Sequence, residues 1–189
     1  MGKTARRLLA PGLLIAILAV ILLFGAIPAG PTSPVAQLDK LSGHFPAVQG
    51  TTLNGERIAL PDGFAGERNL VALGFSTADR DAVTSWESVG MRRYSVAFYA
   101  LPTLDSGGLV WRFLMNNALR FAVTGEDARE RTLALHLDRA AFRRALGLDA
   151  EGGAVVLLLD SAGNELWRAE GPATDELVAT LDAVLAETS

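Results

Sequence analysis

The chain has 189 residues, half of them hydrophobic, with 17 lysines and arginines, 21 aspartates and glutamates and no cysteine. This length suits one domain with an appendage and is short for two full domains. Without cysteine the chain forms no disulfide, no thiolate metal site, no thiol nucleophile and no thiol-linked lipid anchor. The high apolar content also excludes a disordered chain.

The charges are unevenly distributed along the chain. Lys3, Arg6 and Arg7 are the only charged residues before residue 36, which leaves 14 basic and 21 acidic side chains in residues 36–189. An acidic domain with scattered arginines lacks the basic face that phosphate contacts need. We therefore expect no nucleic-acid partner.

The N-terminus reads as a membrane segment. Residues 1–7 are basic, and residues 8–28 form an almost unbroken apolar run. About 20 apolar residues are needed to cross a bilayer core, so this run is long enough to span it. The preceding cations place the N-terminus in the cytoplasm and the rest of the chain outside an inner or cytoplasmic membrane, which is the periplasm in a bacterium.

Two other interpretations of this run stay open. A signal peptide cleaved after Ala29 would leave the domain secreted, but the apolar region of such peptides is usually shorter, about 7–15 residues. A buried core helix is the third interpretation, and its position at the terminus argues against it. We favour an uncleaved single-pass anchor.

Residues 29–42, which include Pro31 and Pro34, form a short extended linker, and the domain proper covers residues 43–187. It opens with two segments, 48–53 and 56–60, on either side of Asn54-Gly55. Asn-Gly is the preferred two-residue turn because both positions tolerate positive φ. The pattern predicts an N-terminal β-hairpin.

Apolar strands and helices then alternate. A strand over Asn69–Phe75 leads into a helix that Ser76 or Thr77 caps and that ends near Gly90. The further elements are a strand over 94–101 closed by Pro102, a helix over 108–123, a strand over 132–137, a helix capped by Asp138 and ended by Gly147, an apolar strand over 154–159, its hairpin partner over 164–169, and a last helix capped by Thr174.

This order predicts an α/β fold with a central mixed sheet and flanking helices. It resembles the thioredoxin-like fold in its redoxin form. The stretch NLVALGFST is similar to the first central strand and the entry to the active-site helix, LHLDRAAFRRALGL to the strand and helix that follow, and VVLLLDSAGNELWRAEG to the terminal hairpin.

Four segments resemble more specifically the mitochondrial ATP synthase assembly factor with a thioredoxin-like domain and its bacterial relatives. They are Phe45–Phe75, Phe98–Leu104, Arg129–Leu148 and Leu158–Leu177. This resemblance implies a role in assembling a membrane complex.

The resemblance also shows which groups are missing. Thioredoxins place two cysteines at the start of the first helix, where the helix N-terminus stabilises a thiolate. Those positions fall near Arg80 and Val83. The proline that normally faces the site before the strand over 154–159 is also missing, since no proline lies between Pro102 and Pro172. Thiol–disulfide exchange and cysteine peroxidase chemistry are therefore excluded.

Other catalytic patterns are weak. His44 and His136 are the only histidines, too few for a zinc site without further ligands at suitable spacing. Residues 160–165 lack the acid density of a calcium loop, and neither a phosphate-binding loop nor a nucleophile elbow occurs. We expect no metal, cofactor or catalytic residue. The alternative is a redoxin-derived enzyme with a non-thiol site around Ser76, Thr77 and Arg80.

Two helices would border the former thiol site and supply the candidates for binding a protein partner. These candidates are Trp86, Trp111, Arg112, Met115, Asn116 and Arg120. Aromatic residues, methionine and arginine are typical of interfaces. The two tryptophans also fit a core at helical spacing, which we favour for both, so the binding role falls to Arg112 or Arg120. The sequence thus predicts a membrane-anchored, redox-inactive, thioredoxin-like binding or assembly module.

Overall fold

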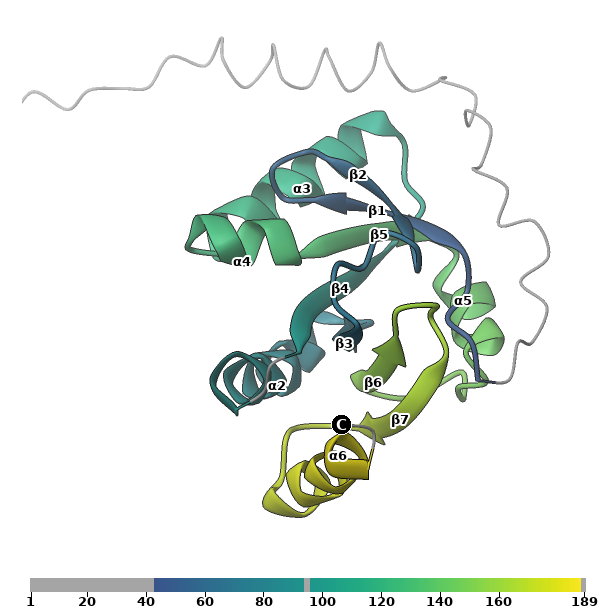
Figure 1. The fold of residues 1–189 in the computed structure, drawn as a ribbon. Helices are drawn as coiled ribbons and strands as arrows, with labels where there is room; N and C mark the ends of the chain where they lie inside the picture. The colour runs from purple at the N-terminus through teal and green to yellow at the C-terminus, as the bar shows by residue number, and fades with distance from the viewer. Residues whose placement is uncertain (1–42, 94–95, 188–189) are drawn as a thin grey trace, which may run out of the picture. The chain divides into compact units, whose positions relative to one another are not determined.

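The computed structural model describes residues 43–187 except 94 and 95 (Figure 1). The predicted basic segment, anchor and linker lie outside the described residues. Within the part that is described, no helix is both long enough and apolar enough to cross a bilayer.

Seven strands form one mixed sheet in the order β2-β1-β5-β4-β3-β6-β7. Strands β3, β4 and β5 are parallel to one another, and every other neighbouring pair is antiparallel. The strands are β1 (Val48–Thr52), β2 (Arg57–Leu60), β3 (Arg68–Gly74), β4 (Ala97–Asp105), β5 (Leu133–Leu137), β6 (Val155–Asp160) and β7 (Glu165–Glu170).

The helices lie on both sides of this sheet (Figure 1). They are the short 3-10 turn η1 (Thr77–Asp79), α2 (Arg80–Arg93), α3 (Leu109–Ala122), α4 (Glu126–Arg131), α5 (Arg139–Ala145) and α6 (Asp175–Glu187). Two apolar clusters fill the space between sheet and helices. One brings α2 and α6 onto the sheet through Trp86 and Leu181, and the other brings α5 onto the opposite face through Phe142.

Alternation along β3 explains why helices cover both faces. Leu70 and Ala72 belong to the cluster with α2 and α6, whereas Val71 and Leu73 belong to the cluster with α5. Successive side chains of a strand point to opposite faces, so a strand that is apolar at every position must be buried on both sides. The central mixed sheet and flanking helices expected from the sequence are confirmed.

Several predicted end signals act as expected. The Asp138 carboxylate accepts a hydrogen bond of 2.9 Å from Ala141 N at the start of α5, and Gly147 follows that helix with a φ of 67°. Thr174 Oγ1 accepts a bond of 3.3 Å from Leu177 N at the start of α6. The β1–β2 hairpin turns at Asn54-Gly55, with Gly55 at a φ of 96°.

Three elements differ from the sequence prediction. Helix α2 continues past Gly90 to Arg93. Pro102 does not close its strand, because β4 changes partner there: Pro102 is the last residue paired with β3, and residues 103–105 continue the strand against β5. A proline is tolerated where a ladder ends, because no partner strand needs its missing N–H. Helix α4 over residues 126–131 was not predicted, although its acids at the start and arginines at the end are typical of a helix.

Candidate functional site

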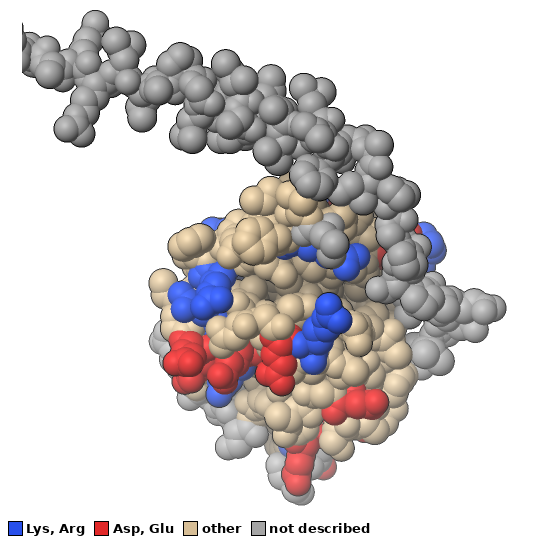
Figure 2. All heavy atoms as spheres, turned by 90° about the horizontal axis from the view of Figure 1, so that it is seen from above, with Lys and Arg blue, Asp and Glu red and all other residues tan. Residues whose placement is uncertain are grey.

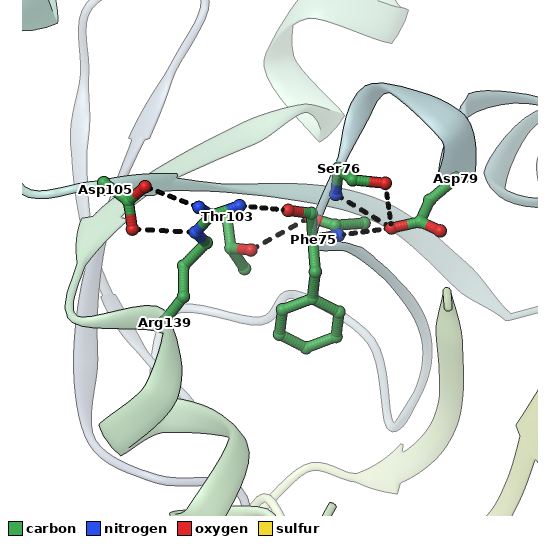
Figure 3. A network of polar contacts seen from close by, with 7 residues as sticks. Phe75, Ser76, Asp79, Thr103, Asp105 and Arg139 are labelled. Carbon is green, nitrogen blue, oxygen red and sulfur yellow. Dashed lines mark hydrogen bonds and ion pairs between the residues drawn. The ribbon is translucent and has the colours of Figure 1, made fainter. Parts of the chain in front are cut away.

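The carboxyl ends of the parallel strands β3, β4 and β5 meet at one edge of the sheet. In open α/β sheets ligands bind at this edge. Figure 3 shows the polar groups that gather there: Ser76 and Asp79 follow β3, Thr103 and Asp105 end β4, and Arg139 begins α5 directly after β5. We call this set the carboxyl-edge network.

Asp79 organises the turn between β3 and α2. Its Oδ2 accepts hydrogen bonds from Phe75 N at 2.8 Å, Ser76 N at 2.8 Å and the Ser76 hydroxyl at 3.2 Å (Figure 3). The Asp79 side chain is buried although it is an acid. A carboxylate that accepts backbone N–H groups forms charge-assisted bonds, which are stronger than neutral ones. These bonds hold the turn in one conformation.

The same carboxylate faces the backbone that enters β6. A Cβ atom placed on Gly153 would lie 3.5 Å from Asp79 Oδ1. Arg80 is exposed at the start of α2, and Val83 is half-buried one turn further along. Asp79 therefore faces Gly153, two residues before β6, and the resemblance places the missing proline just before this strand. The central position of Asp79 was not predicted, although the Ser-x-x-Asp spacing of residues 76–79 is a known helix-start signal.

Arg139 joins three parts of the edge. Its Nε and Nη2 donate to the two oxygens of Asp105 at 2.7 and 2.5 Å, and its Nη1 donates to Phe75 O at 2.5 Å (Figure 3). The hydrogen bond to Asp105 raises the pKa of Arg139. The Thr103 hydroxyl donates to Gly74 O at 3.0 Å. The ends of β3 and β4 and the start of α5 are therefore held together by polar contacts.

A buried arginine supports the neighbouring loop. The Arg143 guanidinium carbon lies 4.3 Å from the centre of the Phe75 ring, a cation–π contact. Its Nε donates to Asp149 O at 2.6 Å and its Nη1 to Gly152 O at 3.2 Å. Arg143 thus fixes the segment before β6 against the turn after β3. Sequence reasoning had assigned Arg143 no role.

The two tryptophans among the candidates have different environments. Trp86 is fully buried, and its Nε1 donates to Gly171 O at 2.9 Å, so the core position we favoured is correct and Trp86 is removed from the binding candidates. Trp111 is 48% exposed, so the core position we favoured for it is wrong. The half-buried side of α3 carries Arg112, Met115, Asn116 and Leu119, and Trp111 lies outside it.

Three other candidates are half-buried on α3, and two of them lie beside His136 of β5. Asn116 Oδ1 lies 2.9 Å from His136 Nε2. Burial lowers the pKa of His136, and the positive charge of Arg112 lowers it further. Arg112 itself donates to Gly107 O at 3.1 Å. Met115 is half-buried and Arg120 is exposed. The structure therefore gathers Arg112 and Asn116 around His136 and leaves Arg120 at the surface.

The carboxyl-edge network offers no paired nucleophile and base. The Ser76 hydroxyl donates to Asp79, which already accepts two backbone groups, while the two histidines bond Asn164 and Asn116. An activated serine needs an adjacent general base. Over residues 43–187, apart from 94 and 95, no three metal-ligating side chains come together. This arrangement forms a firmly held polar surface, and the non-thiol enzyme alternative gains no support from it.

No family model and no curated protein matches the sequence. Solved structures do match the fold. A putative electron transport protein from Aquifex aeolicus is 12% identical with a TM-score of 0.54, and the match covers 79% of this chain and 99% of that one.

Two thiol-related proteins give similar matches. A putative thiol:disulfide interchange protein DsbE from Chlorobium tepidum is 17% identical over 81% of this chain and 100% of that one, with a TM-score of 0.51. The exposed lipoprotein thioredoxin of Streptococcus pneumoniae is 10% identical over 75% and 99%, with a TM-score of 0.50. At these identities the likeness establishes the fold alone: residues 43–187 have a thioredoxin-like fold, and the sequence contains no cysteine.

Proposed function

We propose that the chain is a membrane-anchored, redox-inactive thioredoxin-like domain that binds a protein partner and assists the assembly of a membrane complex. One observation carries the proposal. The turn between β3 and α2 is held by the Asp79 carboxylate through three hydrogen bonds and has no thiol. The fold is kept, whereas Arg80 and Val83 stand near the positions where thioredoxins carry their two cysteines.

A binding role suits this rigid edge. Ser76, Thr77 and Ala78 are exposed, and the backbone beneath them is held by Asp79 and Arg139. A surface that is already ordered loses little conformational freedom when a partner binds, and that preserves affinity. We assign the partner contact to this exposed segment, residues 76–78.

The anchor and the assembly role rest on the sequence. The apolar run over residues 8–28 with its preceding cations supports a single-pass anchor and an extracytoplasmic domain. The resemblance of four segments to the ATP synthase assembly factor supports the assembly role. A tethered domain that searches only the membrane surface meets membrane-complex subunits at a high effective concentration.

Site-specific crosslinking in intact membranes tests the proposal. A photo-crosslinking amino acid replaces Thr77 in the full chain, and the matched control carries it at Ala179, an exposed position on α6. We expect one membrane-complex subunit to be crosslinked at residue 77 and not at residue 179. The same crosslink should still form when an unrelated transmembrane segment replaces residues 8–28. The same background at both positions would overturn the partner proposal.

A further inference from the structure

Helix α3 exposes most of its large apolar side chains, while Met115 and Leu119 are half-buried beside polar residues. Its polar side chains Arg112 and Asn116 lie on the half-buried side, where Asn116 bonds His136. Its large apolar side chains are exposed: Phe121 is 86% exposed and Phe113 is 69% exposed. A helix on a globular domain normally directs its apolar side to the core. The outward side of α3 is therefore apolar, and the described residues do not cover it.

Four exposed apolar side chains share one side of α3. Asn117, whose side chain donates to Phe113 O, lies on the same side between Phe121 and the other three. Val110, Phe113, Leu114 and Phe121 fall within about a third of the helix circumference at 3.6 residues per turn, and Trp111 lies at its border. We call these five residues the α3 apolar face. Contiguous exposed apolar surfaces mark protein or membrane interaction sites. Figure 2, seen from above the view in which α3 lies at the top, shows broad uncharged areas between the charged groups.

The composition of α3 favours a lipid surface over a protein. Its 14 residues include Arg112 and Arg120 and no acid. Helices that lie in the bilayer interface combine aromatic and aliphatic side chains with cations, and tryptophan is enriched at that depth. At 1.5 Å per residue α3 is about 21 Å long, too short to cross a core of about 30 Å. It suits a position in the plane of the interface.

The residues that precede the described domain also favour a lipid surface as the partner of α3. Residues 29–42 separate the apolar run from the domain and reach about 50 Å at most when extended. A domain of about 145 residues has a radius of gyration of about 15 Å, so the linker lets any of its faces reach the bilayer. The tether also keeps the bilayer surface at high effective concentration.

We propose that the α3 apolar face docks onto the phospholipid surface of the membrane that anchors the chain. The five side chains enter the boundary between headgroups and acyl chains, and Arg120 contacts lipid phosphates. Docking fixes the orientation of the domain, so that the carboxyl-edge network is presented at a constant height above the bilayer. This inference rests on the proposed anchor, and the test separates the two.

The absence of cysteine makes the test clean, because a single introduced cysteine is labelled alone. Full-length Phe113→Cys and Phe121→Cys variants carry an environment-sensitive fluorophore, and Ala179→Cys on α6 is the matched control. Each is reconstituted in vesicles of phosphatidylcholine and phosphatidylglycerol that contain acyl-chain quenchers near the headgroups. Flotation of the vesicles reports the anchor, and quenching by lipid reports docking.

We expect all three variants to float with the vesicles. The probes at 113 and 121 should be quenched about threefold more than the probe at 179, because interfacial helices bury their apolar side at the acyl boundary. Protein that floats with equal quenching at all three positions overturns docking and leaves the anchor intact. Protein that fails to float overturns both.

Two other results would overturn the proposal because they show that something other than lipid contacts the α3 apolar face. Iodide in the buffer quenches exposed probes, so protection from iodide that increases with protein concentration, without quenching by lipid, indicates contact with a second copy. Protection seen only in native membranes indicates contact with a protein. Circular dichroism of each variant checks that the fold is kept, which we expect because both phenylalanines are exposed.

Discussion

The Asp79 carboxylate faces the backbone of Gly153, where the chain enters β6. One oxygen of Asp79 lies 3.5 Å from the position of a Cβ on Gly153, and the other accepts three hydrogen bonds from Phe75 and Ser76. The turn after β3 and the loop before β6 therefore meet at a carboxyl group. This contact defines the centre of the proposed binding edge.

Asp79→Ala is expected to destabilise the domain by about 1–3 kcal/mol. The substitution leaves Phe75 N and Ser76 N without their acceptor in a partly buried turn, and such groups incur their desolvation cost. Urea unfolding followed by circular dichroism measures the change. Asp81→Ala, an exposed acid in the first turn of α2, is the control and should change stability little. Equal effects of the two substitutions would show that the Asp79 bonds do not hold the turn.

Arg139→Gln is expected to have a smaller effect, about 1 kcal/mol. The Arg139–Asp105 pair is largely exposed, and exposed ion pairs typically contribute about 0.2–1 kcal/mol. The bond to Phe75 O adds to this. Part of the loss should disappear at high salt because exposed charges are screened. Arg144→Gln, exposed on the same helix, should be neutral, and a salt-independent loss in Arg139→Gln would contradict the electrostatic account.

The two tryptophans should respond differently to truncation. Trp86→Ala removes a fully buried side chain between α2, the sheet and Trp167, and large-to-small core substitutions of this kind cost about 3–5 kcal/mol. Trp111→Ala removes a half-exposed side chain and should cost less than about 1 kcal/mol. Thermal unfolding of the two variants compares them. A similar loss for both would place Trp111 in a core contact that the structure does not contain.

His136 should make stability fall as the solution becomes acidic. Burial first, and Arg112 second, lower the pKa of His136 below the ordinary value of 6.5. Below that pH the unfolded chain binds the proton more readily than the folded one, so the free energy of unfolding decreases from about pH 6.5 downward until the folded pKa is reached. His136→Gln should flatten this part of the profile.

Two measurements check the histidine prediction. NMR titration of the imidazole gives its folded pKa directly, which should lie below 6.5. Urea unfolding at pH 7.5 and pH 5.5 compares the pH dependence of the original chain and the variant. An identical pH dependence in both would mean that His136 does not contribute to it.

The sequence was sufficient to predict the layers of the fold because apolar runs are strong signals. The runs over 69–75 and 154–159 became the buried strands β3 and β6, and Asp138 and Thr174 begin helices as their residue types predict. A strand that is buried on both faces is apolar at nearly every position, so such strands can be predicted from the sequence without the tertiary structure.

The carboxyl-edge network could not be predicted in the same way. Arg139 is 34 residues from Asp105 and 64 from Phe75, and only the parallel arrangement of β3, β4 and β5 brings them together. The exposure of Trp111 was also hidden, because helical spacing marks an apolar side but does not say whether that side faces the sheet. The inward position of Arg112 and Asn116 decides it.

Recovery of a membrane complex by the full chain tests the central claim most directly. The tagged chain is purified from crosslinked membranes in three forms: unchanged, Ala78→Arg at the exposed part of the carboxyl edge, and Ala179→Arg on α6 as the control. We predict that one complex is recovered with the unchanged chain and the control, and is reduced about tenfold with Ala78→Arg, since a desolvated unpaired charge at an interface costs more than 1.4 kcal/mol. Equal recovery in all three forms, or recovery of no complex, would contradict a partner-binding role for this edge.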